Sequence, residues 1–201
     1  MRIMWQRQTL LVALATGLTF AAPLAAQDRA ITLSARSGGF QALTDLNDAG
    51  TADFKKVGFN VGAGVGVQVQ RFITLRGDFT FAENELRSSD VFSGDKLRRY
   101  FYDAAVQLQY PSALGLTPYA FAGAGGVTFD QPGNVKNKTK FAGTFGLGVG
   151  YELPHTGIGL FIEGKGWVYD LSKLNGALAG YDKSQVELGW NAGLSYRIPI
   201  S

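Results

Sequence analysis

The sequence predicts an all-β fold, an eight-stranded antiparallel up-and-down transmembrane β-barrel. Three observations lead to it: an apolar N-terminal leader, eight later segments in which apolar residues alternate with small or polar ones, and connections that alternate in length. The composition agrees, because 27 of the 201 residues are glycine and only 17% are charged, against roughly 25% in soluble domains. A sheet with few water-exposed faces has this composition.

The first 26 residues have the pattern of a secretory signal peptide. Two basic residues and no acidic residue lie in Met1–Arg7, and an apolar run follows from Leu10 to Ala22. A membrane anchor is the alternative, but the run is shorter than the ~20 residues that a spanning helix needs. Cleavage at or near Ala26 leaves residues 27–201 as one barrel domain. Loss of Arg2 and Arg7 lowers the formal net charge from +3 to +1, so the sequence predicts no nucleic-acid partner.

Strands are predicted from period-two alternation, since the mature chain has no apolar run long enough for a spanning helix. A spanning strand needs only ~9 to 11 residues. In residues 58–70 every odd position from Phe59 to Val69 is apolar, whereas the even positions are Gly, Asn or Gln. The eight predicted strands are Ala30–Phe40, Gly58–Gln70, Ile73–Glu85, Arg98–Tyr110, Thr117–Phe129, Lys140–Glu152, Ile158–Tyr169 and Ser184–Ile198.

The connections between these segments alternate between short turns and long polar loops. Three turns are short (71–72, 111–116 and 153–157), and four loops are long (Thr44–Lys56, Arg87–Leu97, Asp130–Thr139 and Asp170–Lys183). Short turns at one end and long loops at the other are typical of outer-membrane barrels, whose turns face the periplasm. A soluble barrel with reversed faces is the alternative. Its exposed face would be about 25 to 35% charged, whereas the polar face of strands 58–70, 117–129 and 140–152 is mostly Gly, Ala, Thr, Asn and Gln.

Aromatic residues near the strand ends predict two girdles at the membrane interfaces, where amphipathic rings are favoured. The periplasmic girdle is predicted on the apolar face at the turn-side ends of the strands and consists of Tyr110, Tyr119, Tyr151 and Tyr196. The other girdle, near the long loops, consists of Phe81, Tyr100, Tyr102, Phe129 and Phe141.

Charged residues are predicted inside the barrel at middle or lower depth. This polar belt has three basic and three acidic members: Arg36, Arg76, Asp78, Asp103, Glu163 and Lys165. Charges away from bulk water are tolerated when they are paired, so the belt is interpreted as a salt-bridged plug. The alternative is a polar permeation path, although eight strands enclose little more than their own side chains.

Catalytic chemistry is not predicted. The chain has no cysteine, which excludes disulfides, a thiolate nucleophile and a Cys-ligated metal site. The single histidine, His155, follows Pro154 in a predicted turn without a nucleophile placed beside it. The glycine-rich runs at 62–66 and 146–150 continue strands and open no helix, unlike a nucleotide-binding loop. We therefore predict no enzyme activity and no catalytic, metal or cofactor site.

The strand pattern, the segment Thr117–Gly125 (TPYAFAGAG) and the ending Asn191–Ile198 (NAGLSYRI) resemble the OmpA-type small outer-membrane β-barrel proteins of Gram-negative bacteria. The resemblance covers essentially the whole mature chain and implies a place in the outer membrane. It also implies an assembly signal read by the barrel-assembly machinery, carried by Asn191, Gly193, Tyr196 and Ile198. Such chains usually end on Phe, whereas this one continues as Pro199-Ile200-Ser201. Enzymes of this fold class need a catalytic His near the outer rim, which His155 does not match.

Two functions remain open at this point. One is a structural or surface-interaction role, in which the long loops contact an unknown extracellular ligand and the barrel is a monomer surrounded by lipid and lipopolysaccharide. The other is a narrow, porin-like pore or a transporter for small or apolar solutes. Small lumen residues favour transport, and whether Phe101, Phe161 and Trp167 fill the lumen decides between the two.

Overall fold

The computed structural model describes residues 29–43, 52–54, 57–88, 96–112, 115–130, 137–170 and 184–200. The predicted signal peptide and most of the four predicted loops lie outside these residues. The described strands are β1 (Arg29–Ala42), β2 (Ala52–Phe54), β3 (Gly58–Gln70), β4 (Ile73–Ser88), β5 (Lys96–Gln109), β6 (Leu116–Asp130), β7 (Lys138–Glu152), β8 (Ile158–Asp170) and β9 (Ser184–Ile200). No helix among the described residues is long and apolar enough to cross a membrane.

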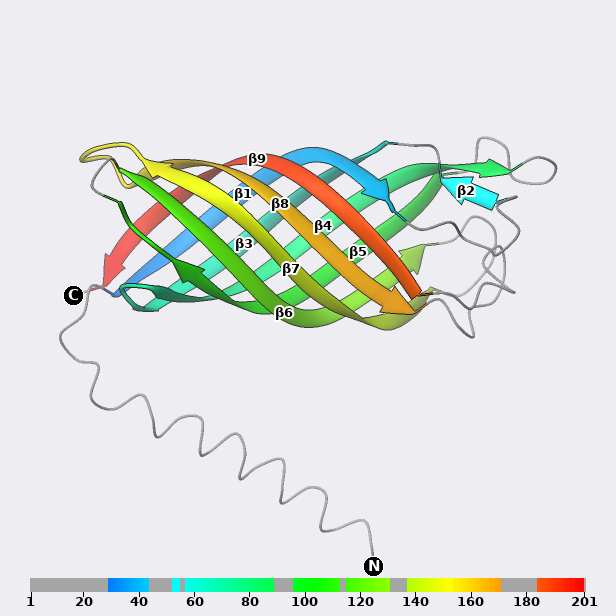
Figure 1. Cartoon of the computed structure of the whole chain (residues 1–201), viewed down its shortest axis with the longest axis horizontal. Coiled ribbons are helices and arrows are strands. Elements are labelled where there is room, and N and C mark those ends of the chain that lie inside the picture. Colours follow the sequence, from blue (N-terminus) through cyan, green and yellow to red (C-terminus); the bar gives the residue numbers. More distant parts are fainter. Residues whose placement is uncertain are drawn as a thin grey trace, which may run out of the picture.

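Eight long strands form one closed antiparallel barrel (Figure 1). Strands neighbouring in sequence pair with each other, β1 pairs with β9, and the pairing of β4 with β5 completes the ring. The short β2 extends the sheet beside the end of β4. The predicted eight-stranded fold is therefore confirmed, and the predicted strand ends lie within three residues of the observed ones. The three-residue β2, inside the predicted loop 44–56, was not predicted.

The barrel has two unlike ends (Figure 1). At the turn end, β3 and β4 are joined by Arg71 and Phe72, and β9 ends at this same end of the barrel. The β7–β8 turn, at the same end, places His155 at a φ of 63° and Gly157 at a φ of 68°. Left-handed φ values of this kind favour glycine and are found in tight turns. The loop end is the opposite end, where β2 lies.

The outer face of the barrel is an apolar band. Large apolar side chains stay exposed there, for example Val65 at 46%, Leu147 at 70% and Ile162 at 65%. Outward charges occur at the loop end, where Glu83 accepts hydrogen bonds from Lys96 at 2.7 Å and Arg98 at 3.1 Å. Between the two ends, the described outward positions carry no charged residue. A surface this apolar is matched to lipid hydrocarbon and would be an aggregation site in water.

The first testable prediction concerns this face assignment. Val65→Arg puts a charge into the lipid-facing band and should cost about 2 to 4 kcal/mol of folding free energy. Gly66→Ser, the next residue on the lumen side, is the matched control and should have a small effect, because a Cβ there would lie 3.1 Å from the Thr74 methyl group and no closer than 3.7 Å to Thr32. Urea titration of both variants in lipid vesicles measures the difference. Equal or reversed losses would contradict the assignment of faces.

The lumen face of β6 corrects one part of the sequence prediction. Tyr119 and Phe129 were predicted to face lipid, but Tyr119 donates a hydrogen bond to Glu163 inside the barrel and Phe129 is 1% exposed in its core. The residues between Pro118 and Thr128 that face outward on β6 are all Ala or Gly. The prediction failed because neither face carries a charge between Thr117 and Phe129, so alternation alone does not say which face of β6 holds the rings. Space decides it near the turn end, since the lumen face of the neighbouring strand β7 carries Gly146, Gly148 and Gly150 there.

Several rings lie directly across from a glycine on the neighbouring strand. Phe121 faces Gly146 inside the barrel, and Trp190 faces Gly39 outside it. A Cβ at either glycine would overlap the ring, so only glycine permits this packing. The other pairs of this kind are Tyr102 with Gly126, Tyr119 with Gly148, Phe145 with Gly166, and Phe161 with Gly193.

Candidate functional site in the barrel lumen

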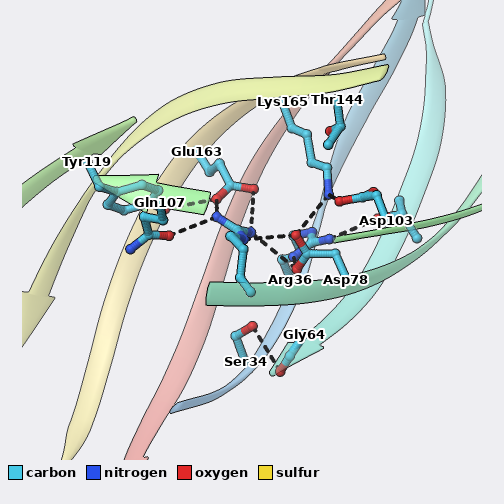
Figure 2. Close-up of polar contacts among 12 residues, drawn as sticks. Ser34, Arg36, Gly64, Asp78, Asp103, Gln107, Tyr119, Thr144, Glu163 and Lys165 are labelled. Atoms are coloured by element: carbon cyan, nitrogen blue, oxygen red, sulfur yellow. Dashed lines mark hydrogen bonds and ion pairs between the residues drawn. The ribbon is translucent and has the colours of Figure 1, made fainter. Parts of the chain in front are cut away.

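The six predicted belt residues form one ion-paired network across the middle of the lumen (Figure 2). Side chains two positions apart on a strand share a face, which brings Arg76 beside Asp78 on β4 and Glu163 beside Lys165 on β8. Arg36 enters from β1 and Asp103 from β5. The network therefore connects four strands that surround the lumen.

Asp78 is the centre of this network. Its carboxylate accepts hydrogen bonds from Arg36 at 2.8 Å, from Arg76 at 2.9 Å and from Lys165 at 2.9 Å. Lys165 also donates to Asp103 at 2.9 Å (Figure 2). All these side chains are at least nine-tenths buried. Breaking a pair would leave a buried charge without its partner, which is far more costly than losing an exposed pair.

Arg76 links Asp78 to the opposite wall of the lumen. Its guanidinium donates to Glu163 at 2.8 Å and to Gln107 at 3.1 Å, and it stacks on Phe121 with 4.2 Å between Cζ and the ring centroid. The Tyr119 hydroxyl donates to the same Glu163 carboxylate at 3.0 Å. The network thus holds three cations and three anions in contact. It has no net charge that would attract a permeating ion.

An aromatic layer fills the lumen between this network and the loop end. Trp167 stacks on Phe101 with 4.6 Å between ring centroids, and Phe40 packs against Phe101 at 5.9 Å and against Trp167 at 5.7 Å. These three side chains are completely buried. Phe129 and Tyr169 extend the layer edge to face, with centroids 5.5 Å apart. Phe101 and Trp167, two of the rings whose packing the sequence did not determine, therefore fill the lumen at this level.

A second buried ion pair lies beside the aromatic layer and was missed by sequence reasoning. Arg99 binds Glu187 and Asn84, all three side chains are buried, and the Arg99 guanidinium lies over the ring of Phe40. The alternation of side chains between the two faces of each strand could have predicted it. Arg99 shares a face with Asp103, four residues further on β5, and Glu187 shares a face with Asn191 on β9.

A cavity of about 170 Å³ with a mixed polar and apolar lining occupies the turn end of the lumen. Arg76, Asp78 and Glu163 line it on the side of the charged network. The remaining wall is mostly hydroxyl, amide and aromatic, and includes Thr32, Ser34, Gln68, Thr74, Gln107, Gln109, Thr117, Tyr119, Phe161, Ser195 and Arg197. The cavity is therefore separated from the loop end by both the ionic and the aromatic layers.

The other predicted residues lie as follows. Tyr110, Tyr151 and Tyr196 point outward near the turn end with 67%, 37% and 51% exposure, but Tyr119 does not join them. Of the predicted assembly signal, Tyr196 and Ile198 face outward, Asn191 is buried, and Gly193 lies beneath the ring of Phe161. No grouping of three metal-binding side chains occurs among the described residues.

Comparison with known proteins gives the family. The model of the outer membrane protein beta-barrel domain matches residues 11–199. The chain belongs to this family. Membership in this outer-membrane β-barrel family agrees with the apolar outer band and the closed antiparallel fold. No curated protein sequence matches it.

Solved structures share the fold of this outer-membrane barrel at low sequence identity. Neisserial surface protein A has a TM-score of 0.60 and 14% identity, over 83% of this chain and 97% of its own. OprG from Pseudomonas aeruginosa has a TM-score of 0.53 and 14% identity, over 86% of this chain and 96% of its own. AlkL, solved in lipid bilayers, has a TM-score of 0.51 and 20% identity, over 87% of this chain and 92% of its own.

Proposed function

We propose that this protein is a non-enzymatic, non-conducting barrel of the Gram-negative outer membrane with a structural or surface-interaction role. Export by the signal peptide would place its turn end in the periplasm and its loop end outside the cell, the usual arrangement of such barrels. The long loops then contact an extracellular ligand, because loops on a rigid scaffold commonly carry recognition. The barrel acts as a monomer within outer-membrane lipid and lipopolysaccharide, and the barrel-assembly machinery reads Asn191, Gly193, Tyr196 and Ile198.

The observation that carries the proposal is closure of the lumen at two levels. Ions would first have to displace the network centred on Asp78, whose cations and anions already satisfy each other. They would then meet the fully buried rings of Phe101 and Trp167, which give no polar group to replace a hydration shell. Both layers are built from strands of the rigid wall, so neither is a loop that could swing aside.

Transport of a small or apolar solute is the second candidate function, and the turn-end cavity of about 170 Å³ is the observation that favours it. Two routes would be available to a solute. A route along the lumen meets the aromatic layer, whereas a route sideways into lipid requires a gap in the wall. The β-pairings are continuous through middle depth at every neighbouring pair of long strands, including the β1–β9 seam. The structural or surface-interaction role therefore has the stronger support.

Planar-bilayer recording on refolded residues 27–201 tests this proposal. We expect no resolved channel steps, together with a heat-modifiable gel band that reports a closed barrel in the same sample. The full chain, expressed in a Gram-negative host, should fractionate with the outer membrane. Discrete, ion-selective steps from heat-modifiable protein would contradict the non-conducting lumen, and recovery as a soluble periplasmic monomer would contradict the membrane location.

A further inference from the structure

The turn-end cavity has polar groups that the barrel itself leaves unused. Within the part of the chain that the structure describes, the hydroxyls of Thr32, Thr117 and Ser195 line the cavity without a hydrogen bond to the protein. Thr32 and Ser195 come from the paired strands β1 and β9, whereas Thr117 comes from β6, which is not next to either of them. Three convergent, unpaired hydroxyls can each donate and accept one hydrogen bond with a bound molecule.

The charged side chains at this cavity are already occupied. Arg76, Asp78 and Glu163 are bound to one another, and Arg197 at the turn end binds Gln68 at 3.0 Å and Glu152 at 3.4 Å. An ionic ligand would therefore enter without a free counter-charge, which is costly away from bulk water. A purely apolar ligand would leave the hydroxyls of Thr32, Thr117 and Ser195 without hydrogen-bond partners, which is also unfavourable.

Two rings give the cavity an apolar surface beside these hydroxyls. Tyr119 and Phe161 line it, and each lies flat against the wall over a glycine, Gly148 and Gly193 respectively. Ring faces held in this way can cover the C–H groups of a ligand while neighbouring hydroxyls and amides bind its O–H groups. Alternating C–H and O–H groups, without net charge, are the chemistry of a polyol.

We propose that the turn-end cavity is a binding site for a small neutral polyol of up to monosaccharide size, entering from the turn end. The volume of about 170 Å³ limits the ligand to a small molecule, which would displace water from the cavity. Displaced water returns to bulk, and the hydroxyls of the ligand restore the hydrogen bonds that the water made. This site is independent of the proposed role of the loops.

Ligand titration followed by NMR tests the site. The probes are glycerol and D-glucose, added to isotope-labelled residues 27–201 in lipid nanodiscs. We expect saturable amide shifts at Thr32, Thr117 and Ser195, and no saturable shifts there with sodium acetate or n-butanol. Thr117→Val should weaken glucose binding about fivefold, the value of one neutral hydrogen bond.

A matched pair of bulky variants on β6 separates the cavity from the outer face. Thr117→Phe should abolish binding, because Thr117 lies across from Gly150 and a ring over that glycine would occupy the cavity. Leu116→Phe, on the lipid face, should leave binding unchanged. If Thr117→Phe does not fold, as a missing heat-modifiable band would report, the glucose affinity of Thr117→Val becomes the deciding measurement. Absence of saturable shifts with both polyols, persistence of binding in folded Thr117→Phe, or stronger binding of acetate would each overturn the proposal.

Discussion

Asp78→Asn is expected to lower the free energy of unfolding by about 3 to 5 kcal/mol. The substitution keeps the shape of the side chain but removes the charge that faces Arg36, Arg76 and Lys165. Three buried cations would then share two carboxylates, and an amide nitrogen would replace one of the acceptor oxygens. Urea unfolding in lipid vesicles, followed by the loss of the heat-modifiable band, measures the change.

A double variant tests whether this loss comes from charge balance. Arg36 has Asp78 as its ion-pair partner and Thr80 as its hydrogen-bond partner at 2.9 Å, so Arg36→Met removes the cation that depends most on Asp78. Two cations and two anions would remain, and the double variant should recover part of the loss, because coupled charges are not additive. Glu152→Gln, which breaks an exposed pair with Arg197, is the control and should have little effect. Additive losses in the double variant would contradict a charge-balanced plug.

Trp167→Ala should also cost about 3 to 5 kcal/mol, because it empties a fully buried ring site against Phe101 and Phe40. Trp190→Ala is the matched control, since the Trp190 ring lies on the outer face and is 47% exposed. Its loss should be clearly smaller in the same urea titration. The Trp167 variant should still show no channel steps, because the ionic network remains across the lumen. Equal losses for the two tryptophans would contradict a packed aromatic layer, and channel steps would show that this layer alone closes the barrel.

Alternation in the sequence was enough to predict the barrel, because membrane strands must present one face to lipid along their whole length. The same alternation correctly placed all six belt residues on the lumen face. It did not predict the partners, because Lys165 on β8 reaches Asp103 on β5 across the lumen, and such contacts depend on the tilt and stagger of a closed barrel. The alternation also failed on β6, where neither face carries a charge between Thr117 and Phe129.

The ring-over-glycine pairs have a consequence for how the barrel closes. In a closed barrel, a register shift at one strand pair changes the total stagger. The change must be compensated at other pairs or at the seam where the first and last strands meet. That seam joins β1 to β9 and places Trp190 against Gly39. A shift of two residues there would set the indole against Ser37 or Gln41, whose side chains occupy the space that the glycine leaves. The contact of Trp190 with Gly39 therefore fixes the register between β9 and β1, and with it the summed stagger of all the strands.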